Sequence, residues 1–123
     1  MLKYNGIVES LRGTEIQEED NKAVIGLEKE LCSIKDKLNC SFKGVYTISI
    51  IDGRIKELTI NFYGLESFPA QIGELTGIEE LNMDYNNISK LSEIEKGLKN
   101  LEKLKHFFVN HNPIMKKLGL EEE

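Results

Sequence analysis

The chain has 123 residues, with 16 lysines and arginines against 21 aspartates and glutamates, and 40% of its residues are hydrophobic. This length falls in the usual range of one domain. The net charge of −5 argues against binding to nucleic acid or to an anionic membrane surface, because both need clustered Lys and Arg. The chain has no apolar run of membrane-spanning length and no signal-peptide pattern at its start. We therefore expect one cytoplasmic domain.

A helical pattern covers residues 15–38. Apolar residues recur there at spacings of three and four, which is typical of one buried helix face: Val24, Leu27, Leu31, Ile34 and Leu38. Thr14 with Gln17 fits a capping box, and Asp20 or Asn21 offers a second possible start. We expect the helix to end at Asn39.

The charged side chains of this helix are expected to lie apart from the core. The opposite face is charged and is predicted to be solvated: Glu28, Lys29, Lys35 and Asp36. Cys32 lies beside the apolar stripe and is interpreted as a small core residue. Cys32 and Cys40 are too few for a disulfide framework, so we expect two free thiols in a reducing compartment.

A β-hairpin is predicted for residues 45–60. Val45–Ile51 is β-branched and alternating, and a second alternating run follows at Arg54–Ile60. Between them stands Asp52-Gly53. This dipeptide is typical of a type I′ turn, which needs positive φ at both central residues.

The second half of the chain repeats itself. Three segments that start at Ile55, Ile78 and Leu104 carry apolar residues at positions one, four, six and eleven, with periods of 23 and 26 residues. These periods fall in the ~20–29 residue range of solenoid repeats built on short parallel strands. We therefore expect Leu58, Leu81 and Phe107, the residues at position four, to lie on neighbouring rungs of one stack.

Position nine of these segments carries a second signal. It holds Asn86 and Asn112, whose amides are predicted to turn inward as a structural asparagine ladder and satisfy backbone groups of the bending chain. The first segment has Tyr63 there instead. We therefore expect the ladder to start at the second coil.

The three segments and the stretch between the first two resemble a known family. Leu65–Ile78 is similar to the LxxLPxxIGxLxxL form of leucine-rich repeats in plant and bacterial proteins, and the segments are similar to LxxLxLxxNxL. The helix and hairpin resemble the N-terminal cap of such proteins. The resemblance covers roughly residues 20–114. It implies an α/β fold, a short solenoid in which a capping helix and a β-hairpin precede about three parallel-strand coils.

Domain boundaries follow from this resemblance. Residues 1–44 are expected to form an N-terminal helical cap, residues 45–120 the hairpin plus repeats within the same structural domain, and residues 121–123 an acidic tail. The connector Leu91–Leu101 lacks the proline and is expected to be helical on the convex side. Met115, Leu118 and Leu120 are expected to cover the last coil.

Few residues suggest chemistry. His106 and His111 are the only histidines, and their spacing suits neither a helical nor a strand metal site, so no metal or other cofactor is expected. Glu57 and Glu80 share one column of the repeat, where a solvated ladder is favoured over a catalytic pair. No nucleophile-elbow or phosphate-loop motif occurs. We therefore expect no enzymatic activity.

The concave sheet face is the candidate site. Position eight holds Phe62, Tyr85 and His111, position five holds Thr59, Asn82 and Phe108, and position seven holds Asn61, Asp84 and Asn110. Exposed aromatic side chains rimmed by polar ones are typical of binding surfaces. The alternative is that Phe62 and Phe108 tuck under the hairpin or the C-terminal tail. The predicted partner-binding residues are Phe62, Glu80, Asn82, Asp84, Tyr85, Phe108, Asn110 and His111.

The favoured function is a noncatalytic protein-interaction module, acting as an adaptor or regulatory subunit. Charges around the column lean acidic, so we expect a protein partner with a basic patch, oriented by Glu80 and Asp84. A monomer is favoured over a dimer. The alternative is a structural element that self-associates through the C-terminal end of the solenoid, at Ile114, Met115 or Leu118.

Overall fold

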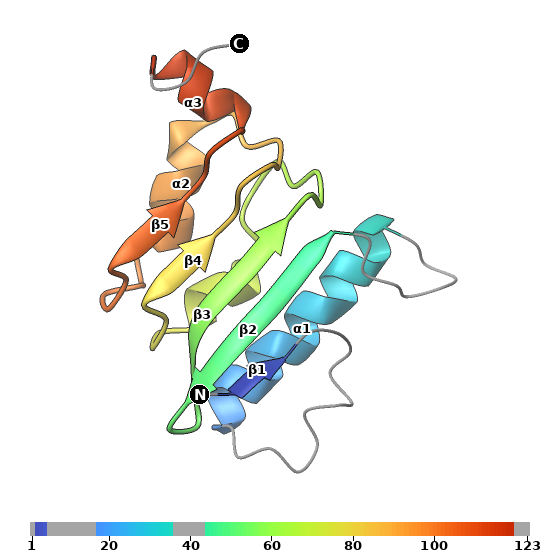
Figure 1. The fold of residues 1–123 in the computed structure, drawn as a ribbon, viewed down its shortest axis with the longest axis vertical. Helices are drawn as coiled ribbons and strands as arrows, with labels where there is room; N and C mark the ends of the chain where they lie inside the picture. Colours follow the sequence, from blue (N-terminus) through green and yellow to red (C-terminus); the bar gives the residue numbers. More distant parts are fainter. Residues whose placement is uncertain (1, 5–16, 36–43, 120–123) are drawn as a thin grey trace.

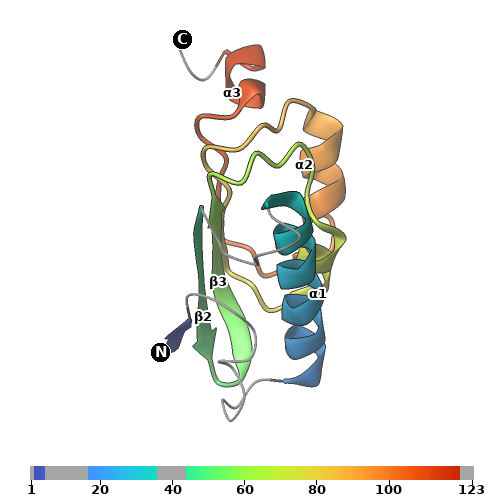
Figure 2. The same cartoon turned by 90° about the vertical axis from the view of Figure 1, so that its right-hand side faces the viewer.

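The sheet of this protein carries two of its helices on one face. A computed structural model describes residues 2–4, 17–35 and 44–119. Within these residues the fold is mixed α/β, with five strands in the spatial order β1-β2-β3-β4-β5 (Figure 1). Figure 2 shows the helices α1 and α2 together on one side of the sheet. We call the opposite side the exposed face.

The elements follow in chain order. The strands are β1 (Leu2–Tyr4), β2 (Val45–Ile51), β3 (Arg54–Asn61), β4 (Glu80–Asn82) and β5 (His106–Phe108). The helices are α1 (Glu18–Lys35), the 3-10 helix η2 (Ala70–Glu74), α2 (Leu91–Leu98) and α3 (Pro113–Lys117). None of these helices, within the described residues, is long and apolar enough to cross a membrane.

The predicted hairpin is confirmed. β2 and β3 pair antiparallel, and the turn residues Asp52 and Gly53 have φ of 53° and 77°. A register shift opposite Ser49 and Ile50 marks a bulge. The bulge explains how Ile55 and Leu58, three residues apart, both face the core, since strict alternation would place them on opposite faces.

The predicted rung is also confirmed. β3, β4 and β5 pair parallel, with Leu58 opposite Leu81 and Leu81 opposite Phe107. Leu58 and Leu81 are buried, and Phe107 is half-buried against the ring of Phe68 at a centroid distance of 5.8 Å. The connector after β4 forms α2, so its expected helix is confirmed on the same face as α1 (Figure 2).

Helix α1 covers the hairpin end of the sheet. It begins at Glu18, between the two starts offered by the sequence, and the Asn21 N–H donates to the carbonyl of Gln17 at 2.9 Å. Val24, Leu27 and Leu31 are buried as predicted. Thr14, the predicted end at Asn39, and the side chains of Ile34, Leu38, Cys32 and Cys40 lie outside the described residues.

The prediction of a solvated Glu28 is wrong. Its side chain is only 3% exposed, and the Tyr46 hydroxyl donates to Glu28 Oε2 at 2.9 Å. Glu28 lies four residues after Val24 and therefore on the same helix face. A buried carboxylate needs a hydrogen-bond donor, and Tyr46 of β2 supplies it.

The two ends of the sheet also differ from expectation. Leu2–Tyr4 is a strand antiparallel to β2, although the sequence predicts a helical cap over residues 1–44. At the other end, Ile114 is the buried residue of α3 and Met115 packs against the core as predicted, whereas Leu118 is 47% exposed and does not cover the end of the sheet. Leu120 lies outside the described residues. Because α3 begins at Pro113, Ile114 falls in its first turn and faces the core.

The ionisation of Tyr63 tests whether its side chain is buried near Glu28 of α1. Its burial raises its pKa to about 12, and the negative charge of Glu28 contributes to the shift. An unfolded chain ionises tyrosine near pH 10, so the unfolded state loses this proton first as the pH rises. We expect this difference to lower the free energy of unfolding by about 2 kcal/mol between roughly pH 9 and pH 11.5.

Urea denaturation of the wild type and of Tyr63→Phe at both pH values checks this expectation. The phenylalanine variant should lose about 2 kcal/mol less stability over the interval, because it has no proton to release at this position. Equal losses in the two proteins would mean that Tyr63 ionises normally in the folded state.

Candidate interaction surface

A column of three stacked rings crosses the exposed face where the chain leaves the strands. The rings of Phe62 and Tyr85 have centroids 4.4 Å apart, those of Tyr85 and His111 4.2 Å, and both pairs are tilted by 11°. Phe62 is 51% exposed and Tyr85 is 44% exposed. The structure thus brings together the three residues predicted at position eight, and we call them the ring column.

Backbone conformation sets the direction of these rings. Phe62, Tyr85 and His111 have φ of 66°, 57° and 56°, the left-handed region that side chains other than glycine rarely adopt. The same conformation recurs at position eight of the segments that start at Ile55, Ile78 and Leu104. Each such residue costs on the order of 1–3 kcal/mol unless the surrounding structure holds it in place, so the ring column depends on the turns beneath it.

Asn86 holds the first of these turns. It is buried, and its Oδ1 accepts the N–H groups of Tyr63 at 3.0 Å and Leu65 at 3.2 Å. Its Nδ2 donates to the carbonyls of Ile60 at 2.7 Å, Met83 at 3.0 Å and Asp84 at 3.3 Å. One amide therefore joins the turn after β3 to the turn after β4.

Asn112 has the same role in the turn after β5. It is buried, and its Oδ1 accepts the Ile88 N–H at 3.0 Å. Its Nδ2 donates to the carbonyls of Met83, Val109 and Asn110 at 3.0–3.1 Å. Both asparagines lie inward at position nine, where the sequence places them, and they support Tyr85 and His111 from below.

The polar residues beside the ring column brace the backbone. Asn82 Oδ1 accepts the Asp84 N–H at 3.0 Å, and Asp84 Oδ1 accepts the Asn110 N–H at 2.7 Å. The carbonyl of Asn110 in turn accepts the Tyr85 N–H at 3.0 Å. One oxygen of Asp84 is therefore committed to the turn, which differs from the purely partner-orienting role expected from the sequence.

Charged residues form two rows across the starts of β3, β4 and β5. Glu79 lies between Lys56 and Lys105, each at 3.4 Å, and these lysines, Lys105 above all, hold the pKa of Glu79 below its usual value. The two lysines thus offset the negative charge of Glu79. In the next row Glu57 stands opposite Glu80, and Ser49 Oγ donates to Glu57 Oε1 at 2.7 Å.

Phe108 lies apart from the ring column, at the β5 end of the face. It is 38% exposed, and its ring is stacked with that of His106 at 6.4 Å. The alternative in which Phe62 and Phe108 are covered is therefore wrong for the described residues. The two histidines stack on different partners, and no three His, Cys, Asp or Glu side chains gather as a metal site within the ranges that the structure describes.

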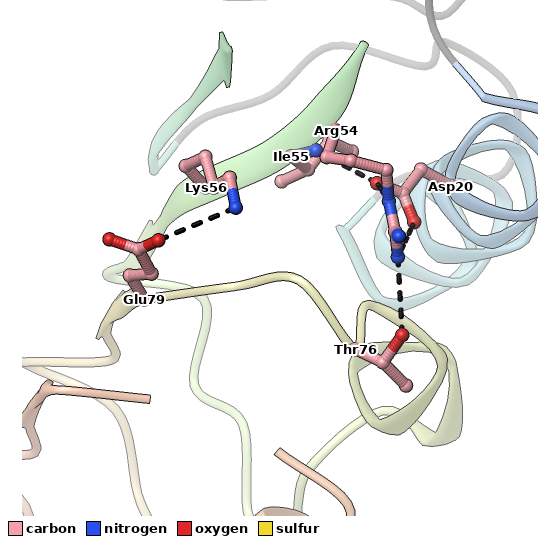
Figure 3. Close-up of polar contacts among 6 residues, drawn as sticks. All are labelled: Asp20, Arg54, Ile55, Lys56, Thr76 and Glu79. Atoms are coloured by element: carbon pink, nitrogen blue, oxygen red, sulfur yellow. Dashed lines mark hydrogen bonds and ion pairs between the residues drawn. The ribbon is translucent and has the colours of Figure 1, made fainter. Parts of the chain in front are cut away.

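A buried ion pair at the start of β3, the end of the strand opposite to Phe62, was missed by the sequence prediction. Asp20 of α1 is fully buried and meets the guanidinium of Arg54 at 3.0 and 3.3 Å (Figure 3). The Ile55 N–H donates to the same carboxylate at 2.8 Å, and Arg54 reaches Thr76 Oγ1 at 3.1 Å. Hydrogen bonds to Asp20 raise the pKa of Arg54 above its usual value.

This ion pair has a structural role. It fixes the start of α1 to the start of β3 and to the segment after η2, as Figure 3 shows. The signal in the sequence was Asp20 in the first helical turn and Arg54 directly after the hairpin turn, but their separation of 34 residues hides the pairing.

Comparison of the chain with protein-family models, with curated proteins and with solved structures found no match.

Proposed function

We propose that this protein is a noncatalytic interaction module of the leucine-rich-repeat type, an adaptor or regulatory subunit that binds a protein partner on the exposed face. The observation that carries the proposal is the ring column of Phe62, Tyr85 and His111. Large exposed rings on a rigid sheet lose little entropy on binding and are typical of interface hot spots. The repeat period, the parallel register of β3, β4 and β5, and the inward asparagines support the repeat assignment.

Charge supports a partner with a basic patch. The charge of Glu79 is offset by two lysines, so the remaining negative charge near the ring column comes from Glu57, Glu80 and Asp84, none of which forms an ion pair with another described residue. Glu80 lies between Glu57 and His106 in one row of the sheet. Complementary charges at the rim of an interface mainly raise the rate of association and fix orientation. Phe62, Tyr85, Phe108 and His111 supply the apolar contact.

The proposal is tested with the double variant Tyr85→Asn/Phe108→Ala. Asparagine is chosen at position 85 because it tolerates positive φ better than alanine. Affinity capture from the source cells should recover the partner with the wild type and lose it with the double variant. With the purified partner, we expect an affinity loss of about 100-fold or more, since two hot-spot residues are removed.

Leu91→Ala is the matched control, because Leu91 is an equally exposed apolar residue on α2, on the other side of the sheet. It should bind like the wild type. The melting temperatures of all three proteins should agree within a few degrees, because the changed side chains are exposed. Equal binding by the double variant would show that the ring column is not the partner site.

A further inference from the structure

Two parallel rings on β5 leave their faces open. His106 and Phe108 are alternate residues of this strand, so their side chains stand on the same side of the sheet. The two rings are parallel to within 11°, and their centroids lie 6.4 Å apart. Phe108 is 38% exposed, and His106 is exposed as well. We call these two residues the β5 ring pair.

The distance between the two rings shows that neither covers the other. Aromatic carbon atoms in contact lie about 3.5–4.0 Å apart. Parallel rings with centroids 6.4 Å apart are therefore either separated by more than this contact distance or shifted sideways by about 5 Å, which removes their overlap. In the ring column, by contrast, Tyr85 stacks with one ring on each side at 4.4 and 4.2 Å. The β5 ring pair thus offers the aromatic faces that the Tyr85 ring does not.

A carboxylate stands beside the β5 ring pair. In the parallel register of β4 and β5, Glu80 lies opposite His106 and Asn82 lies opposite Phe108. Neighbouring strands are about 4.8 Å apart, so the Glu80 side chain rises from the same face next to the His106 ring. On its other side Glu80 has Glu57 of β3 as its opposite residue. Two carboxylates therefore follow one another in the row that ends at the ring pair.

These two carboxylates lack a cation among the described residues. The neighbouring row is compensated, because Lys56 and Lys105 each lie 3.4 Å from Glu79. Neither Glu57 nor Glu80 forms an ion pair within the part of the chain that the structure describes. Like charges opposite each other in a sheet are destabilising. A cation supplied by a partner would relieve this repulsion at Glu80.

We propose that the β5 ring pair and Glu80 bind an arginine side chain of the protein partner. The guanidinium group lies against the ring faces of His106 and Phe108 and pairs with the Glu80 carboxylate. Arginine fits this site better than lysine, because its guanidinium is planar, weakly hydrated and able to pair with a carboxylate through two hydrogen bonds. This inference rests on the proposed function and names the residue type that the partner contributes.

The test is an NMR titration of the isotope-labelled protein with two acetylated and amidated pentapeptides, Gly-Gly-Arg-Gly-Gly and Gly-Gly-Lys-Gly-Gly, at low salt. We expect the arginine peptide to shift the ring signals of His106 and Phe108 and to saturate in the millimolar range. The lysine peptide should bind at least about threefold more weakly. Glu80→Gln should weaken binding of the arginine peptide about threefold or more, and Phe108→Leu about two- to fivefold.

Glu93→Gln is the matched control, because it removes the same charge from a half-buried glutamate of α2, on the other side of the sheet. This variant and Tyr85→Asn should both bind the arginine peptide like the wild type. Three results would overturn the proposal: no saturable shift up to about 50 mM, equal affinity for the two peptides, or unchanged affinity in both Glu80→Gln and Phe108→Leu.

The captured partner separates this inference from the proposed function. Glu80→Gln should weaken its binding, whereas Glu93→Gln should not. A partner that is lost with Tyr85→Asn/Phe108→Ala but binds Glu80→Gln like the wild type would leave the proposed function in place and remove the arginine contact. A partner that binds the double variant like the wild type would instead remove the proposed function.

Discussion

Replacing Asn86 with alanine is expected to lower the free energy of unfolding by about 3–5 kcal/mol. The amide makes five hydrogen bonds to the backbone, and the variant leaves buried groups of two turns without their partner. Each unsatisfied buried group costs on the order of 1–3 kcal/mol, although such costs do not add fully. Urea denaturation monitored by circular dichroism measures the loss.

Asn87→Ala is the matched control, because Asn87 is the exposed neighbour of Asn86 and has the same side chain. Its stability should stay within about 0.5 kcal/mol of the wild type. Asn86→Asp keeps the acceptor toward Tyr63 and Leu65 but loses the donor toward three carbonyls, so it should not restore stability. If Asn86→Ala cost no more than Asn87→Ala, the two turns would not be held by this amide.

Asp20→Ala is expected to cost about 3–5 kcal/mol, because it leaves the partly buried Arg54 guanidinium and the Ile55 N–H without their acceptor. The same variant removes the connection between α1 and β3. A double-mutant cycle with Arg54→Ala should give a coupling energy of at least about 1 kcal/mol, since the two side chains are in direct contact.

The protein offers an exposed pair for comparison. Lys22 and Glu18 lie 3.2 Å apart on α1, with side chains 74% and 80% exposed. Glu18→Ala should change stability by less than about 0.5 kcal/mol, because exposed ion pairs in helices contribute little. Similar losses of stability from Glu18→Ala and Asp20→Ala would contradict the account that the Asp20–Arg54 pair contributes more because it is buried.

Local signals explain what the sequence could predict. The Asp52-Gly53 turn can be predicted because both residues readily adopt the positive φ that the turn requires. The periodic apolar positions determine which residues of β3, β4 and β5 face the core. The amide of Asn86 bonds to groups of its own turn and of the turn one period earlier, so its position in the periodic pattern is enough to predict that it faces inward. These features depend on the spacing of residue types along the chain, which the sequence gives directly.

The features that were missed depend on contacts between distant residues. Glu28 is buried because Tyr46 of another element donates to it, and Leu2–Tyr4 is a strand only because β2 pairs with it. The ring column could be predicted only in part, because it depends both on the spacing of residues along the chain and on the conformation of the turns. The sequence placed Phe62 and Tyr85 in one column, but their stacking follows from positive φ in the turns, which β-strand alternation does not predict.

The most direct test of the ring column is a nuclear Overhauser spectrum of the aromatic protons. We expect the Tyr85 ring protons to show cross-peaks to the ring protons of both Phe62 and His111, because the centroids lie 4.4 and 4.2 Å from that of Tyr85. Both contacts require the turns after β3, β4 and β5 to be in register. Cross-peaks from Tyr85 to neither ring would contradict the ring column and the interaction surface built on it.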